Sequence, residues 1–408
     1  MQAATNDQRA RLFFLDWVRI VAFFVLILYH VGMYYVTWGW HVKSASASVT
    51  LESYMMLSSP WRLGLLFLIS GVASSFMLAK SGAFTFVRAR SWRLLIPLAF
   101  GMLVIVPPQP FFEVIEKYAY QGSYGDFMRL YLHNYRGFVS GPGTHLILPT
   151  WNHLWFVAYL WVYSLLLGAL VLALGARFDT CARHVAAALT GWKLMVLPAA
   201  VLGLARVLLL TPFPPTNALF GDWYNHALYV SLFLLGAMLA RQHAVWERLD
   251  SSRWYGLGIA LTCWALLKIY FSLPDGLVAE QNLVWLQQVQ RMVYGLCQWS
   301  AMVAACGFAH RHLNVDSAKR RYLAEAVFPV YIVHQTLIVS MAHALKPLRL
   351  DPGIEGIILV VLTLTFSFTI FELVRRCAPL RPLFGIAHGG LAKGERQPAA
   401  PRAQAPLA

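Results

Sequence analysis

The sequence has little charge. Only 12% of its 408 residues are Asp, Glu, Lys or Arg, whereas 59% are hydrophobic and the mean hydropathy is +0.57. A soluble globular domain carries about 25% charged residues. This shortage excludes an ordinary soluble domain and indicates an integral membrane protein.

Cysteine is also scarce. The five cysteines form no C-x-x-C pair, and none falls in a segment predicted to face outward. Neither a disulfide framework nor a cysteine-based metal site is therefore indicated. We expect no metal ion and no bound cofactor.

Long apolar runs dominate the sequence. These runs approach the roughly 20 residues that a helix needs to cross a bilayer, and they do not alternate as membrane β-strands would. They predict an all-α, polytopic membrane protein with about ten transmembrane helices, near residues 12–37, 61–80, 94–107, 154–174, 194–211, 223–241, 254–273, 291–309, 322–345 and 354–377.

Basic residues outnumber acidic ones, 33 to 18. With a cytoplasmic N-terminus, 22 of the 33 fall on the inner side and 7 in outer loops, while Arg19, Arg62, Arg206 and Lys268 lie within spans. The positive-inside rule then predicts that both termini are cytoplasmic. The basic residues are concentrated in alternate loops, so the positive charge reports the membrane topology. We therefore expect a lipid bilayer as the partner and no nucleic acid.

The runs predict one membrane-embedded domain over residues 1–385, followed by a Pro/Ala-rich cytoplasmic tail, 386–408, that we expect to be disordered. A large outer loop, 108–153, is rich in aromatic residues and is predicted to be folded. Aromatic faces suit sugar rings, but the same residues are also typical of an interfacial aromatic belt.

The first apolar run contains three ionisable residues, Asp16, Arg19 and His30. An ionised side chain in hydrocarbon costs about 3 kcal/mol or more unless it faces protein or water. At 100° per residue all three fall in one helical stripe, with Arg19 and His30 roughly 16 Å apart along the axis. The stripe predicts a polar seam across the membrane. A structural alternative is an Asp16–Arg19 pair with His30 hydrogen-bonded at the outer interface.

Arg88, Arg90 and Arg93 form a basic cluster on the predicted cytoplasmic side. Such a cluster suits phosphate groups. Ordinary positive-inside anchoring explains the same residues.

A late span contains Glu325 and His334, nine residues apart. This spacing places them on opposite faces of an ideal helix, so we expect no direct pair unless Pro329 bends the helix. His334 is either functional or a packed core histidine.

Three of these motifs resemble the acyltransferase 3 family of membrane enzymes. They are L-D-x-x-R followed by a histidine (Leu15 to His30), R-x-x-R at Arg90 and Arg93, and Y-I-V-H at 331–334. Within the family, segments 38–44, 152–156 and 232–239 resemble the branch that modifies periplasmic glucans. The likeness extends from about residue 11 to residue 385.

The resemblance implies an O-acyltransferase of the bacterial inner membrane. Its co-substrate would be a cytoplasmic acyl-CoA, succinyl or acetyl, and its acceptor a hydroxyl of a periplasmic glucan or other envelope carbohydrate. His30 would act as general base. Arg19 would bind the donor or stabilise an oxyanion, and Asp16 would orient Arg19. The donor would be bound by Arg88, Arg90 and Arg93, and possible pocket or acceptor residues are His41, His153, Trp155, Glu325 and His334.

Several alternatives remain open at this point. His41, His153 and Trp155 equally fit interface anchors, and Lys268 and Arg206 are expected to extend to the interface. Arg62 is expected either to do the same or to bind an anionic acyl group. Transfer can be direct or pass through an acyl-enzyme. The rival functions are an ion-coupled transporter of a small anionic or sugar substrate, and an inactive scaffold for envelope assembly.

Overall fold

The computed structural model describes residues 12–141, 144–274, 276–277 and 283–386. Among these residues the regular secondary structure is helical apart from a small antiparallel ribbon, β1 (Val139–Gly141) with β2 (Thr144–His145). Eight helices are long and apolar enough to cross a membrane, or up to ten if each of two bent pairs forms one span. The prediction of an all-α polytopic membrane protein is confirmed. The predicted tail lies outside the described residues from 387 onward.

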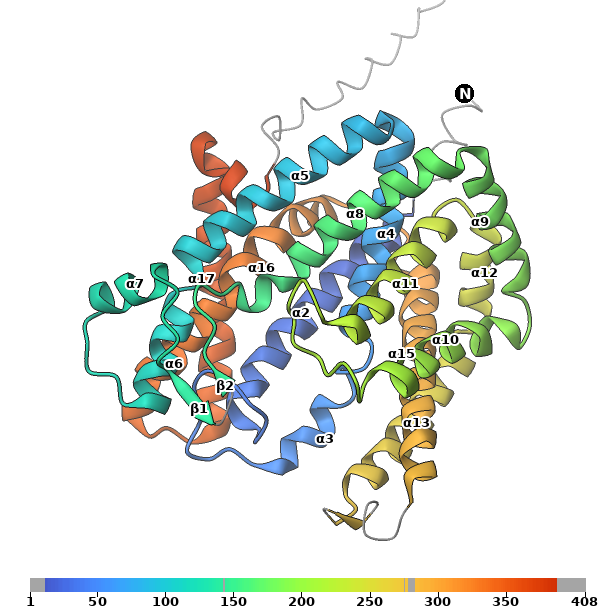
Figure 1. Ribbon diagram of the computed structural model, residues 1–408. Helices are drawn as coiled ribbons and strands as arrows, with labels where there is room; N and C mark the ends of the chain where they lie inside the picture. The colour runs from blue at the N-terminus through green and yellow to red at the C-terminus, as the bar shows by residue number, and fades with distance from the viewer. Residues whose placement is uncertain (1–11, 142–143, 275, 278–282, 387–408) are drawn as a thin grey trace, which may run out of the picture.

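Each predicted apolar run coincides with a helix (Figure 1). These helices are α2 (Phe13–Tyr35), α4 (Arg62–Ser81), α5 (Ala83–Phe100), α8 (Trp155–Leu174), α10 (Lys193–Leu209), α11 (Trp223–Leu239), α13 (Arg253–Phe271), α15 (Val284–His312), α16 (Ala318–Leu345) and α17 (Pro352–Arg376).

Shorter elements connect them. These are α3 (Glu52–Met55), α6 (Pro108–Tyr118), α7 (Tyr124–Leu132), α9 (Ala176–Ala188), α12 (His243–Ser251), the π-helical turn η2 (Gly101–Ile105) and the 3-10 turns η1 (Val49–Leu51), η3 (Asn152–Leu154), η4 (Lys346–Leu348), η5 (Ala378–Leu380) and η6 (Pro382–Phe384).

The third span is longer than the sequence predicts. The apolar run starts at residue 94, but α5 begins at Ala83 and continues through η2 into α6. The part of α5 before residue 94 carries three arginines, which lower its hydropathy, so a search for apolar runs misses this part of the helix. The arginine cluster therefore lies on a helix with fixed side-chain directions.

Two pairs of helices turn sharply. α9 and α10 meet at 113°, and α11 and α12 meet at 112°. α10 and α11 are 17 residues each, which is short for a bilayer crossing. The runs at 194–211 and 223–241 reach membrane length only together with these neighbours.

α4 and α11 pack with their backbones almost in contact. A Cβ atom added at Gly236 would lie 1.9 Å from the carbonyl oxygen of Leu68, and one at Gly71 would lie equally close to the carbonyl oxygen of Phe233. Only glycine permits this approach from both sides. The pair fixes α4, which contributes residues to the candidate site.

The large loop at 108–153 is folded, as predicted. Its aromatic residues pack chiefly on one another and form a small separate core of Val114, Phe127, Tyr131, Phe138 and Leu148, with Phe111, Tyr118 and Tyr120 packed against it. Most of these rings are therefore unavailable as a flat platform for sugars, because the loop needs them for its own stability. Trp151, at the end of the segment, differs in lining a cavity that is described below.

Candidate active site

Arg19 and His30, both of α2, line two different cavities. Arg19 lines a cavity of about 430 Å³, here termed the arginine cavity, together with Asp16, Arg90, Arg93 and Glu325. His30 lines a cavity of about 340 Å³, here termed the histidine cavity, whose other lining residues include His41, His153 and Trp155. The two ends of the predicted stripe on α2 therefore line two separate cavities at different levels along the helix.

The arginine cavity receives two of the three clustered arginines. Arg90 is only 8% exposed, and its Nε donates to Ser164 Oγ at 3.2 Å. Its buried Nη2 has no hydrogen-bond partner among the described residues. Arg93 is exposed and its Nε donates to the carbonyl oxygen of Gly385 at 3.2 Å. Arg88 is exposed and does not line the cavity. The helical phase of α5 separates Arg88 from the other two.

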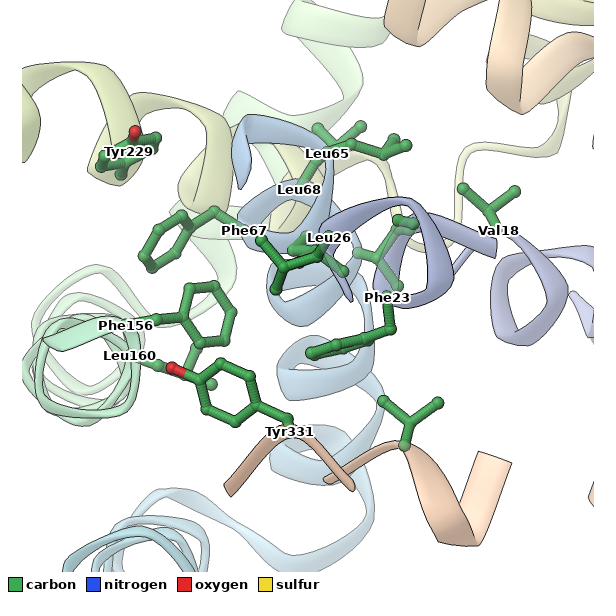
Figure 2. Close-up of a cluster of buried hydrophobic side chains, with 14 of the residues drawn as sticks. Val18, Phe23, Leu26, Leu65, Phe67, Leu68, Phe156, Leu160, Tyr229 and Tyr331 are labelled. Carbon is green, nitrogen blue, oxygen red and sulfur yellow. The ribbon is translucent and has the colours of Figure 1, made fainter. Parts of the chain in front are cut away.

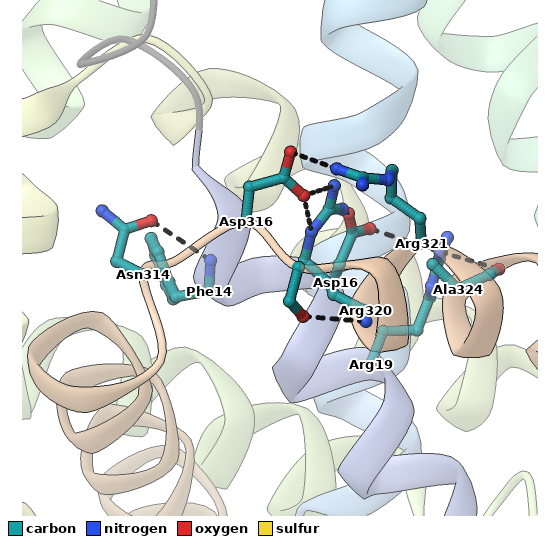
Figure 3. A network of polar contacts seen from close by, with 9 residues as sticks. Phe14, Asp16, Arg19, Asn314, Asp316, Arg320, Arg321 and Ala324 are labelled. Atoms are coloured by element: carbon teal, nitrogen blue, oxygen red, sulfur yellow. Dashed lines mark hydrogen bonds and ion pairs between the residues drawn. The ribbon is translucent and has the colours of Figure 1, made fainter. Parts of the chain in front are cut away.

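Asp16 joins α2 to the start of α16 (Figure 3). It accepts hydrogen bonds from Arg19, at 3.3 Å, and from Arg320. Arg320 also donates to Asp316 at 2.7 Å, and this bond lowers the pKa of the Asp316 carboxyl. Arg19 Nη2 reaches the carbonyl oxygen of Ala324 at 3.3 Å. Asp16 is therefore shared between two arginines, and Arg320 is a partner that the sequence did not reveal.

Glu325 and His334 lie at different cavities, although both belong to α16. Glu325 lines the arginine cavity, whereas His334 is fully buried and contacts His30. The expectation that they do not pair is confirmed. α16 thus passes both sites, as α2 does.

His30 and His334 form a hydrogen-bonded pair. His30 Nδ1 lies 2.8 Å from His334 Nε2, and His334 Nδ1 lies 2.6 Å from the carbonyl oxygen of Tyr331. A carbonyl only accepts, so His334 carries its proton on Nδ1 and presents Nε2 as an acceptor. His30 must then donate through Nδ1. In its neutral form, the Nε2 atom of His30 is left as a free proton acceptor.

The other histidines of the cavity are held by a polar network. His41 Nδ1 lies 2.6 Å from Glu113 Oε2, and its Nε2 lies 3.1 Å from Gln335 Nε2. Gln335 also donates to Gln109 at 3.0 Å. His153 Nε2 lies 3.1 Å from the carbonyl oxygen of Ile332. Because these ring nitrogens are already engaged, His41 and His153 are less suited than His30 to take a proton from a ligand.

The loop before α11 supplies a further wall. Thr216 and Asn217 line the histidine cavity, and their backbone N–H groups donate to Asp222 Oδ2 at 3.2 and 2.6 Å. Asp222 is fully buried and also accepts from Tyr159 Oη at 2.8 Å. The carboxylate holds this loop against the cavity. Its role was not predicted, since a lone aspartate at a span end resembles an ordinary loop residue.

A thin apolar layer lies between the two cavities. Figure 2 shows five of its side chains in one buried cluster: Phe23, Leu26, Phe156, Leu160 and Tyr331. Leu66 and Phe156 line both of them. Phe23 and Leu160 complete the arginine side, and Leu26 and Tyr331 the histidine side. The Tyr331 ring lies 5.5 Å from that of Phe23 and 6.0 Å from that of Phe156, measured between centroids. The cavities therefore lie back to back across about one layer of side chains.

Comparison with known proteins identifies the family of the chain. An acyltransferase domain model matches residues 12–372. Glucans biosynthesis protein C of Salmonella heidelberg (strain SL476) and that of Salmonella agona (strain SL483) are each 24% identical to this chain over 387 residues, covering 92% of this chain and 94% of the relative. No solved structure matches the chain. The match over nearly all of its length, and the motifs that place Asp16, Arg19 and His30 on α2, identify the chain as a multi-pass membrane protein of the acyltransferase 3 family.

Proposed function

We propose that the protein transfers an acyl group from an acyl-CoA bound at the arginine cavity to a carbohydrate hydroxyl bound at the histidine cavity. The observation that carries this proposal is the back-to-back arrangement of a basic cavity and a histidine cavity along one helix. The relatives are named for glucan biosynthesis, so a glucan is the acceptor to test first. Succinyl and acetyl groups are the candidate acyl groups.

The arginines of the arginine cavity support the binding of the acyl donor there. Arg19, Arg90 and Arg93 line one cavity and can meet the phosphates of CoA. Arg19 shares its cavity with Arg90 rather than with His30, which supports donor binding over oxyanion stabilisation. Asp16 would then keep Arg19 oriented through their ion pair.

His30 supplies the base at the acceptor end. The hydroxyl oxygen attacks the thioester carbonyl carbon while its proton passes to His30 Nε2. The C–S bond then breaks, the new ester forms, and the CoA sulfur leaves as a thiolate that receives the proton from the imidazolium. His334 keeps the His30 Nδ1 proton in place throughout. Direct transfer requires no acyl-enzyme.

The apolar layer sets a condition on the donor. The uncharged pantetheine arm must pass between Leu66 and Phe156, while the charged nucleotide stays among the arginines. Such a layer would also keep water of the histidine cavity away from a thioester that is still on the arginine side.

The test is transfer by the purified protein in nanodiscs. Labelled succinyl-CoA and acetyl-CoA are offered with glucan and other envelope glycans, and labelled glycan is measured for wild type, His30→Ala and His133→Ala. His133 is exposed on the outer segment and serves as a matched histidine control. We expect His30→Ala to lose transfer while eluting as a folded protein, and His133→Ala to retain it. Equal transfer by wild type and His30→Ala would reject the role of His30.

The same proposal includes a bacterial inner-membrane location with both termini in the cytoplasm. A reporter fused after residue 130 should then report the periplasm. A cytoplasmic signal would place the histidine cavity on the cytoplasmic side and would contradict the proposed direction of transfer.

A further inference from the structure

Arg62 is a buried cation without an anionic partner. It is the first residue of α4 and only 5% exposed, and its Nε and Nη1 atoms have no hydrogen-bond partner in the part of the chain that the structure describes. Among the described residues no Asp or Glu forms an ion pair with it. Its guanidinium carbon lies 3.2 Å from the centre of the Tyr29 ring. Of the two alternatives that the sequence left open for Arg62, extension to the membrane interface is therefore wrong, because the side chain is buried.

A guanidinium in this state is costly to the folded protein. A buried charge is normally paired, because the attraction of its partner offsets the loss of hydration. The face of one tyrosine ring compensates only part of that loss. The unused N–H groups therefore point to an anion that binds during the functional cycle.

Arg62 stacks on Tyr29, the residue that precedes the proposed base in α2. The rings of Tyr29 and His30 are 6.1 Å apart between centroids, so the cation stacks on the immediate neighbour of His30. Leu66, one turn along the same face of α4, lines both cavities, and Leu63 lines the histidine cavity. Glu113, the carboxylate bonded to His41 of the histidine cavity, forms its ion pairs with His41 and Lys117, each at 2.6 Å, and not with Arg62.

We propose that Arg62 binds a carboxylate at the far end of the transferred acyl group, and so selects a dicarboxylic acyl donor such as succinyl-CoA. This inference rests on the proposed function. With the thioester carbonyl beside His30, two methylene groups place a second carboxylate about 4 Å away, from C–C bonds of about 1.5 Å. Carboxylate is an acceptor that the guanidinium group binds well, whereas an acetyl group offers nothing to it.

The first test compares donors. The kcat/KM values for succinyl-CoA and acetyl-CoA are measured with a neutral glucan for wild type, Arg62→Lys, Arg62→Gln and Arg206→Gln. Arg206 is a matched control, since its guanidinium carbon lies 3.7 Å from the Tyr294 ring centre and its Nε is also buried without a partner. We expect Arg62→Gln to lose about tenfold or more with succinyl-CoA and to change little with acetyl-CoA. Arg62→Lys should recover part of the selectivity, and Arg206→Gln should leave it unchanged.

Two outcomes of this test would overturn the inference. One is an equal loss with both donors in Arg62→Gln, which would indicate a purely structural role. The other requires the assay to be repeated with a glucan that carries carboxylates. A loss that appears only with this glucan, and with acetyl-CoA as the donor, would assign the anion to the acceptor.

A second measurement does not depend on transfer. The thermal unfolding of wild type and Arg62→Gln is followed with added succinate or with uncharged succinamide. Stabilisation by succinate alone, lost in Arg62→Gln, supports the anion site even if no donor is turned over, in which case only the proposed function fails. Identical responses of the two proteins to both compounds would reject the site.

Discussion

The pairing of His30 with His334 leads to a quantitative prediction for His334→Phe. Phenylalanine has nearly the same shape as histidine but no ring nitrogen. It would leave the Nδ1–H of His30 and the carbonyl of Tyr331 without their partners at 2.8 and 2.6 Å. Each unpaired buried polar group costs about 1–3 kcal/mol, so we expect the free energy of unfolding to fall by about 2–6 kcal/mol for the two groups together.

The loss of activity should exceed the loss of stability. Without its acceptor, the Nδ1 proton no longer fixes the tautomer that leaves Nε2 free, and the imidazolium formed during attack loses its partner. General base catalysis contributes about 10²- to 10⁴-fold, so kcat should fall by about 10²-fold or more. The assay measures kcat for acyl transfer under conditions in which chromatography shows the variant to be folded.

His334→Gln provides the matched control. Its side-chain oxygen can accept from His30 Nδ1, so this variant should recover part of the activity that His334→Phe loses. Wild-type kcat in His334→Phe would refute the argument that His334 positions the base.

Three further predictions concern other parts of the site. Arg90→Gln should raise the KM for acyl-CoA by about tenfold, as expected for loss of a charged hydrogen bond, whereas Arg88→Gln should leave the KM unchanged. Equal effects of the two substitutions would show that the two sides of α5 do not differ in donor binding. Phe156→Ala should join the two cavities and raise acyl-CoA hydrolysis without acceptor relative to transfer, while an unchanged ratio would show that the ring is no barrier. Gly236→Ala should lower the melting temperature strongly, because its Cβ would clash with the backbone at Leu68; a wild-type value would show that α4 and α11 can separate freely.

Much of the helical architecture and part of the candidate site could be predicted from the sequence. The phase of Asp16, Arg19 and His30 on α2 could be worked out from 3.6 residues per turn, and the structure has them on cavities. The phase of α5 could equally have separated Arg88 from Arg90, but the low hydropathy of the part before residue 94 concealed that part of the helix.

The long-range pairs could not be predicted in this way. His30 and His334 are 304 residues apart, as are Asp16 and Arg320, and nothing local marks one as the partner of the other. The same holds for Phe156 and Leu66, which read as ordinary apolar residues of two spans. Their role depends on which helices pack together, and that depends on close contacts such as the one at Gly236.

The loop aromatics show a different limit of the sequence. Their number fitted either a sugar-binding surface or an interfacial belt, whereas Phe127 and Tyr131 are fully buried in the small core of the loop. Composition alone cannot separate a ring that binds a ligand from one that a small folded unit needs for its own packing.

Transfer across a sealed membrane tests the central claim most directly. Proteoliposomes of one orientation are loaded with glucan, and labelled acyl-CoA is added only on the side of the arginine cavity. The account predicts labelled glucan inside the vesicles, with free CoA released outside, and no transfer when donor and acceptor are exchanged. Transfer that occurs only when both substrates are on the same side would contradict it.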